Sequence, residues 1–79
     1  MVTPESIKQG IETGIACEQV EVDGDGQHFQ ALVVSAAFEG KSRIQRHQMV
    51  YAALGDRMRE EIHALSMRTL TPRERQSGG

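Results

Sequence analysis

The sequence predicts a small α+β domain in which a three-stranded sheet lies under helices. Two observations carry this prediction. Apolar residues recur with helical spacing in two segments, and they alternate with polar residues in three others. The expected order along the chain is helix, strand, strand, helix, short helix, strand, which is typical of a layered α+β sandwich. The chain has 79 residues, so we expect one domain at residues 1–72 and a flexible tail at residues 73–79.

The first helix is expected to start after Thr3, which can cap it, with Pro4 at the first helical position. Ile7, Ile11 and Ile15 recur every four residues and share one helical face. This stripe is predicted to pack on the core.

Two strands should follow as an antiparallel hairpin. Val20 and Val22 alternate with polar residues, and residues 28–35 read as the second strand. Between them, Gly24, Asp25 and Gly26 are residue types that tolerate a positive φ, as hairpin turns require.

The second helix is expected to begin after Ser42, because Ser42 and Gln45 have the spacing of a capping box. Gly55 suits the left-handed position just past its end. Its core-facing side is predicted from the apolar pattern, with Val50 and Ala53 beside the stripe of Ile44, His47, Tyr51 and Leu54.

The rest of the domain is expected to hold a short helical turn at residues 57–62 and a third strand at residues 63–69. Thr71, Pro72 and Glu74 repeat the capping pattern. Residues 73–79 contain no apolar side chain to hold a helix on the core, so we expect this tail to be frayed.

Composition excludes several classes of protein. No nucleophile with a recognisable base, no glycine-rich phosphate loop and no paired carboxylates occur in a suitable context, so an enzyme is not expected. Cys17 is the only cysteine, which fits a reducing compartment. No apolar run is long enough to span a bilayer. The expectation is a cytoplasmic protein without membrane contact.

Charge is divided unevenly along the chain. Residues 1–40 carry seven acids and one lysine, whereas residues 41–79 carry eight bases and four acids. Lys41, Arg43 and Arg46 gather at the start of the second helix, where they are candidates for receiving phosphate. A basic face is a hypothesis at this stage, because the two halves can interleave in the folded domain.

The histidines and the cysteine are the candidate metal ligands. His28 and His63 stand at expected strand ends, where imidazoles are accessible, but their spacing matches no zinc template. On spacing alone, hydrogen-bonded histidines are the commoner interpretation. Cys17 is a rival ligand whose better-supported reading is a packed apolar residue, and His47 reads as a packed imidazole on the helix.

Several short motifs agree in order with one known family. They are GQHF at 26–29, FEGKS at 38–42, QRH at 45–47, HALS at 63–66 and TLTP at 69–72. In these motifs the chain resembles the BolA family, and the loop at 26–29 is most similar to its small acid-stress branch, the IbaG branch.

The resemblance implies a type II KH-like α-β-β-α-α-β sandwich and a partner. In BolA-like proteins a histidine and a loop residue supply half of a [2Fe-2S] site, here His63 and His28, and a monothiol glutaredoxin with glutathione supplies the rest. The implied function is an adaptor in iron-sulfur trafficking, iron homeostasis or the acid and redox stress response. If both imidazoles bind one iron, a reduction potential above that of an all-thiolate cluster is expected.

The alternative is a DNA-binding transcriptional regulator that uses Lys41, Arg43 and Arg46. KH domains clamp nucleic acid with a GXXG loop, and the segment 40–43 lacks the second glycine. A third interpretation is a structural partner protein without metal. Whether the apo chain forms a homodimer, which client receives the cluster and in which direction it moves stay open.

Overall fold

A computed structural model describes residues 3–25, 27–55 and 65–78. The elements in these ranges are α1 (Pro4–Gly14), β1 (Gln19–Gly24), β2 (Phe29–Val34), the 3-10 helix η1 (Ala36–Phe38), α2 (Arg43–Leu54), β3 (Leu65–Leu70) and α4 (Pro72–Gln76). The short helix expected at residues 57–62 and the expected start of the third strand at residues 63 and 64 lie outside the described residues. Within those ranges, no helix is long and apolar enough to cross a membrane.

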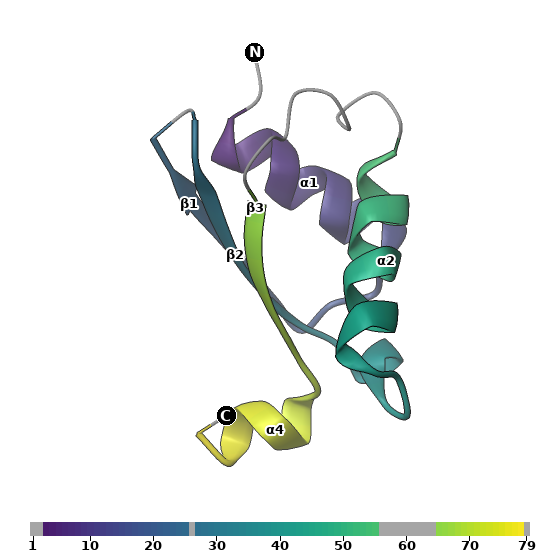
Figure 1. Cartoon of the computed structure of the whole chain (residues 1–79). Coiled ribbons are helices and arrows are strands. Elements are labelled where there is room, and N and C mark those ends of the chain that lie inside the picture. Colours follow the sequence, from purple (N-terminus) through teal and green to yellow (C-terminus); the bar gives the residue numbers. More distant parts are fainter. Residues whose placement is uncertain (1–2, 26, 56–64, 79) are drawn as a thin grey trace.

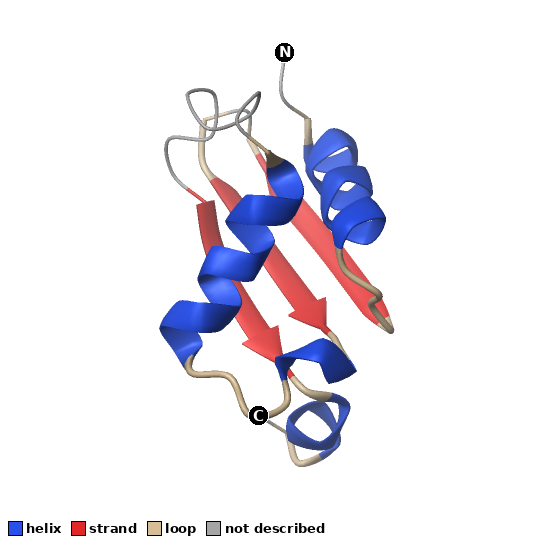
Figure 2. Cartoon of the chain, turned by 90° about the vertical axis from the view of Figure 1, so that its right-hand side faces the viewer, coloured by secondary structure: helices blue, strands red, loops and turns tan. Residues whose placement is uncertain are grey.

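The three strands form one sheet in the order β1-β2-β3. β1 pairs antiparallel with β2, which confirms the hairpin, and β3 pairs parallel with β2. Both long helices, α1 and α2, lie on the same face of this sheet (Figures 1 and 2). The predicted α+β sandwich is therefore confirmed as a two-layer arrangement.

Helix α1 begins and packs as its sequence predicts. The Thr3 side chain accepts the N–H of Ser6, and the Ser6 hydroxyl accepts the N–H of Thr3 in return. Ile7 and Ile11 are fully buried and Ile15 nearly so, which confirms the isoleucine stripe. These three side chains join the inner faces of β1, β2 and β3 in a single apolar core.

Helix α2 has the predicted capping box of Ser42 and Gln45, but its core face differs from the prediction. Val50 and Leu54 are buried, whereas Ile44 is 71% exposed and Tyr51 48% exposed. At 100° per residue, Ile44 and Tyr51 lie about 100–120° around the helix from Val50. A helix on the surface of a two-layer domain buries one stripe only, so these two side chains face solvent.

The hairpin glycine serves a different purpose from the one expected. Gly24 does not adopt a positive φ. It belongs to β1 and pairs with Phe29, and a Cβ at this position would lie 2.5 Å from the Phe29 ring and 2.6 Å from the His28 carbonyl oxygen. Glycine is required because the two strands approach each other closely there.

The C-terminal segment forms a helix where a frayed tail was expected. α4 begins with a capping box of Thr71 and Glu74, and the Glu74 carboxylate pairs with Arg46 of α2 at 2.7 Å. The expectation considered only apolar contacts. A polar contact to α2 connects α4 to the domain instead, so the ordered structure continues past residue 72.

Candidate functional site

The loop between β1 and β2 holds His28 at the first position before β2. The Asp25 carboxylate accepts the N–H groups of Gln27 at 2.9 Å and His28 at 2.8 Å, and the Asp25 N–H donates to the His28 carbonyl oxygen at 3.2 Å. These backbone N–H groups, that of His28 foremost, lower the pKa of Asp25 below its usual value. His28 is exposed, and its backbone is held in place by Asp25.

The sheet brings the start of β2 beside the start of β3. Phe29, which follows His28, pairs with Leu65. His63 precedes Leu65 by two residues in the sequence and lies outside the described residues. An open pocket of about 380 Å³ surrounds His28 and is lined by Asp23, Gly24, Asp25 and Gln30.

The described part of the chain contains no group of three or more histidine, cysteine, aspartate or glutamate side chains suited to a metal ion. An exposed imidazole is a good donor for iron, but one such donor leaves most coordination positions open. A cluster bound at His28 needs further ligands from elsewhere in the chain or from a partner.

Cys17 lies at the other end of the sheet from His28, because Gln19 pairs with Val34 while Gly24 pairs with Phe29. Its Sγ donates to the Ile15 carbonyl oxygen at 3.2 Å, and the residue packs against the core. Burial, and then the charge of Glu12, raise the pKa of this thiol, which disfavours the thiolate. The structure separates Cys17 from His28.

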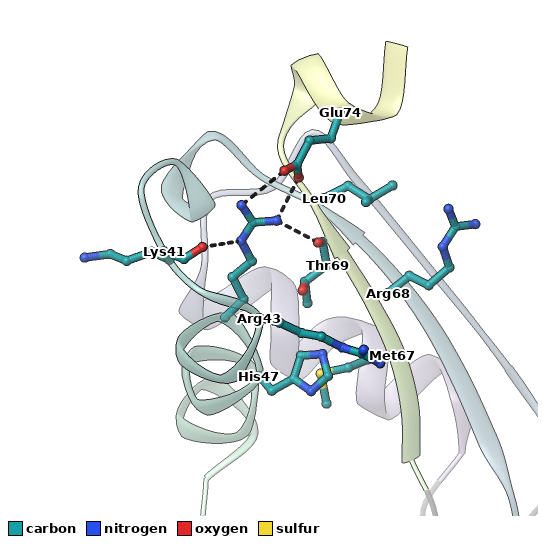
Figure 3. A pocket seen from close by; sticks show the side chains of 9 residues that line it. Lys41, Arg43, His47, Met67, Arg68, Thr69, Leu70 and Glu74 are labelled. Carbon is teal, nitrogen blue, oxygen red and sulfur yellow. Dashed lines mark hydrogen bonds and ion pairs between the residues drawn. The ribbon is translucent and has the colours of Figure 1, made fainter. Parts of the chain in front are cut away.

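A second pocket, of about 610 Å³, lies between α2 and β3. We call it the α2–β3 groove. Its lining comprises residues 67–70 of β3, Glu74, and the side chains of Lys41, Arg43, Arg46 and His47 (Figure 3). Arg43 extends from α2 toward β3 beside His47, whereas Lys41 and Arg68 point outward in different directions (Figure 3).

Arg46 is occupied within the fold. Its guanidinium donates to the carbonyl oxygens of Lys41 and Thr69, both at 3.0 Å, and to both carboxylate oxygens of Glu74 at 2.7 and 3.3 Å. It also lies 5.9 Å from the centre of the Phe38 ring. This guanidinium, followed by the Thr71 N–H that donates to the same carboxylate, lowers the pKa of Glu74 to about 2. Because the charge of Arg46 is paired with that of Glu74, the unpaired cations near the groove are other residues.

Lys41, Arg43 and Arg68 supply the free positive charge at the groove. All three are exposed, and Arg46–Glu74 is the only ion pair within residues 3–25, 27–55 and 65–78. Sequence reasoning missed Arg68, because an outward residue of a strand resembles any solvated residue. Arg68 can be recognised as a groove residue only when β3 is known to be an edge strand.

His47 forms part of the groove wall. Its Nε2 atom is buried and has no hydrogen-bond partner among the described residues. Burial, followed by the charge of Arg43, lowers the pKa of His47. The ring is therefore neutral at neutral pH, as a packed imidazole would be.

Comparison with known proteins identifies the family. A family model described as BolA-like protein matches residues 2–74. The chain belongs to the BolA-like family. It is 36% identical over 69 residues to the acid stress protein IbaG of Escherichia coli, covering 86% of this chain and 82% of that protein. It is 38% identical over 84 residues to BolA-like protein 2 of Homo sapiens, covering 95% and 96%.

Solved BolA structures have the same fold. A BolA protein homologue from Coxiella burnetii is 49% identical, with a TM-score of 0.84 over 96% of this chain and 99% of that chain. A bol-like protein from Babesia bovis is 28% identical, with a TM-score of 0.87 over 99% and 94%. The expected family and its α+β fold are both confirmed.

In this BolA-like domain the two candidate sites occupy opposite ends of the sheet. His28 precedes the start of β2, and the α2–β3 groove adjoins the end of β3. The five residue steps from Phe29 to Val34 span about 17 Å. His28 and the basic residues predicted from the sequence therefore do not form one site, whereas His63 lies outside the described residues.

Proposed function

We propose that this chain is an adaptor that pairs with a monothiol glutaredoxin and shares a [2Fe-2S] cluster with it. His28 and His63 are the ligands that the chain contributes, and the glutaredoxin thiolate and glutathione complete the set. The observation that carries this proposal is the exposed His28, fixed by Asp25 next to the start of β3. Membership of the BolA-like family supports it.

The donor set explains why a partner is needed. Two imidazoles are neutral, whereas the iron-sulfur core requires anionic thiolates to balance its charge and fill its remaining positions. When bound, the cluster would supply an electron-accepting and transferable iron-sulfur unit.

Anaerobic reconstitution of the chain with glutaredoxin and glutathione tests the proposal. Visible absorption and circular dichroism should show a heterodimer spectrum that differs from that of the glutaredoxin homodimer, and H28A and H63A should each alter it. H47Q is the matched control, since His47 lies in the α2–β3 groove at the other end of the sheet. A spectrum that is insensitive to both His28 and His63 would exclude shared ligation.

DNA binding is the second candidate, and one observation favours it. The chain is 39% identical over 51 residues to a protein of Haemophilus influenzae named DNA-binding transcriptional regulator BolA, covering 65% of this chain and 50% of that protein. The cations available for such contacts are Lys41, Arg43 and Arg68, because Arg46 is paired with Glu74.

Salt dependence of binding to a duplex distinguishes this second candidate. If these cations contact phosphates, the slope of log affinity against log salt should fall by about 1 for each of K41Q, R43Q and R68Q. K8Q, on α1 and outside the groove, serves as the control. If K8Q changes the salt slope as much as K41Q does, the attraction to DNA is unspecific.

A further inference from the structure

The α2–β3 groove opens onto a free strand edge. It touches four consecutive residues of β3, from Met67 to Leu70. Successive side chains of a strand point to opposite faces of the sheet, so a pocket that touches all four lies along the edge of the strand. The strand order β1-β2-β3 leaves β3 unpaired by any described strand on that side.

The backbone of this edge offers hydrogen-bonding groups to a partner. The Leu70 carbonyl oxygen accepts the N–H of Ser35, so Leu70 and Arg68 direct their backbone groups toward β2. Met67 and Thr69 direct theirs outward, because these directions alternate along a strand. Arg46 already binds the outward carbonyl oxygen of Thr69. The edge before Thr69 is a template for another strand.

The charge around this edge selects the kind of strand that fits. Lys41, Arg43 and Arg68 are exposed beside the groove and have no ion-pair partner within the described ranges. Among the described residues that line the groove, the one carboxylate is that of Glu74, and it is paired with Arg46. A strand added at this edge therefore binds more favourably if it carries carboxylates.

We propose that the free edge of β3 receives an extended acidic peptide segment of a partner protein, which adds as a fourth strand beside β3. A peptide supplies both N–H donors and carbonyl acceptors for the outward groups of Met67, whereas a phosphodiester has no donor for the Met67 carbonyl oxygen. The carboxylates pair with Arg43, Lys41 and Arg68. Since His28 lies at the other end of the sheet, this strand and a partner at His28 can bind together.

Synthetic peptides test the proposal with the whole chain. The first probe alternates glutamate with threonine over about eight residues. The second has lysine in place of glutamate, and the third keeps glutamate but carries backbone N-methyl groups that block strand pairing. The acidic peptide should bind and shift the amide signals of Met67 and Thr69 in NMR spectra, and the other two should not bind.

Charge variants locate the site. R43Q, K41Q and R68Q should each weaken binding of the acidic peptide about 2- to 5-fold, the range of an exposed ion pair. K8Q on α1 and R75Q on α4 remove the same charge from exposed residues outside the groove lining and should leave the affinity unchanged. All five positions are exposed, so the fold should persist in every variant.

Three results would overturn the proposal. Equal affinity for the N-methylated peptide would show that side-chain charge alone causes binding. Binding of a single-stranded oligothymidine in the groove without binding of the peptide would assign the surface to nucleic acid. Self-association of the chain that disappears in R43Q would assign the edge to a second copy of this chain. None of these results depends on glutaredoxin or His28, so the cluster proposal is tested separately.

Discussion

Arg46 joins three elements of the domain through one guanidinium group. It is 13% exposed and binds the loop before α2 through Lys41, the end of β3 through Thr69, and α4 through Glu74. The sequence made Arg46 a candidate phosphate contact because it gathers with Lys41 and Arg43 at the start of the second helix. The structure instead gives Arg46 a role in holding the groove together.

Replacement of Arg46 by glutamine should destabilise the domain by about 2 kcal/mol, because two backbone carbonyl groups lose a charged donor. R43Q removes the same charge one helical turn away, from an exposed residue, and should change the free energy of unfolding by less than about 0.5 kcal/mol. Denaturant unfolding measures both. Equal effects of the two substitutions would contradict a structural role for Arg46.

Glu74 should make stability depend on pH in the acid range. Its pKa is lowered from 4.5 to about 2 in the folded protein. Its contribution is therefore fully present above pH 4.5 and is lost as the pH falls through about 2. Thermal unfolding of the native chain and of E74Q should differ at pH 6 and converge near pH 2. A difference that stays constant over this range would show that the ion pair does not titrate.

At the scale of elements, local signals in the sequence predicted where helices start and where strands lie better than they predicted which residues pack together. The N-cap at Thr3 and the capping box of Ser42 and Gln45 depend on residues at most three apart, so sequence alone reveals them. Which side of α2 meets the sheet depends on partners that are distant in the sequence, and Ile44 and Tyr51 were assigned wrongly for that reason. The Arg46–Glu74 pair, 28 residues apart, was missed for the same reason. The placement of His28 at an exposed strand start was predictable, because alternation located the hairpin.

The corrected face of α2 makes a paired prediction. L54A should cost about 2–5 kcal/mol of unfolding free energy, because Leu54 is buried and its truncation leaves a cavity. I44A removes a similar side chain from the 71% exposed Ile44 and should cost less than about 0.5 kcal/mol. Urea unfolding of both variants decides the question, and a large loss from I44A would restore the stripe first predicted.

The contact between α1 and α2 depends on a missing side chain. A Cβ at Gly14 would lie 2.5 Å from the Cβ and 2.8 Å from the Cα of Ala53. G14A should therefore destabilise the domain by about 1–3 kcal/mol, because backbone must move. A53G removes one of the two clashing atoms, so the double variant should lose less than the sum of the single losses. Strict additivity in this double-mutant cycle would exclude the clash.

At the scale of the whole molecule, the sheet places acidic residues of the first half of the chain and basic residues of the second half at opposite edges. The acidic residues Glu21 and Asp23 lie on β1 at one edge of the sheet, and Arg68 lies on β3 at the other, next to Lys41 and Arg43. His28 precedes β2 at one end of the strands, and the α2–β3 groove adjoins the opposite end, where β3 finishes. This arrangement gives the two proposed partners, the glutaredoxin and the acidic peptide, separate surfaces.

The central claim is that His28 and His63 bind the shared cluster, and pulsed EPR measures it most directly. The chain is labelled with ¹⁵N-histidine, combined with unlabelled glutaredoxin and glutathione, and the cluster is reduced. We expect two ¹⁵N couplings from directly bound imidazoles, with one lost in H28A, one lost in H63A and both kept in H47Q. A reduced cluster in the intact complex without any ¹⁵N coupling would contradict it.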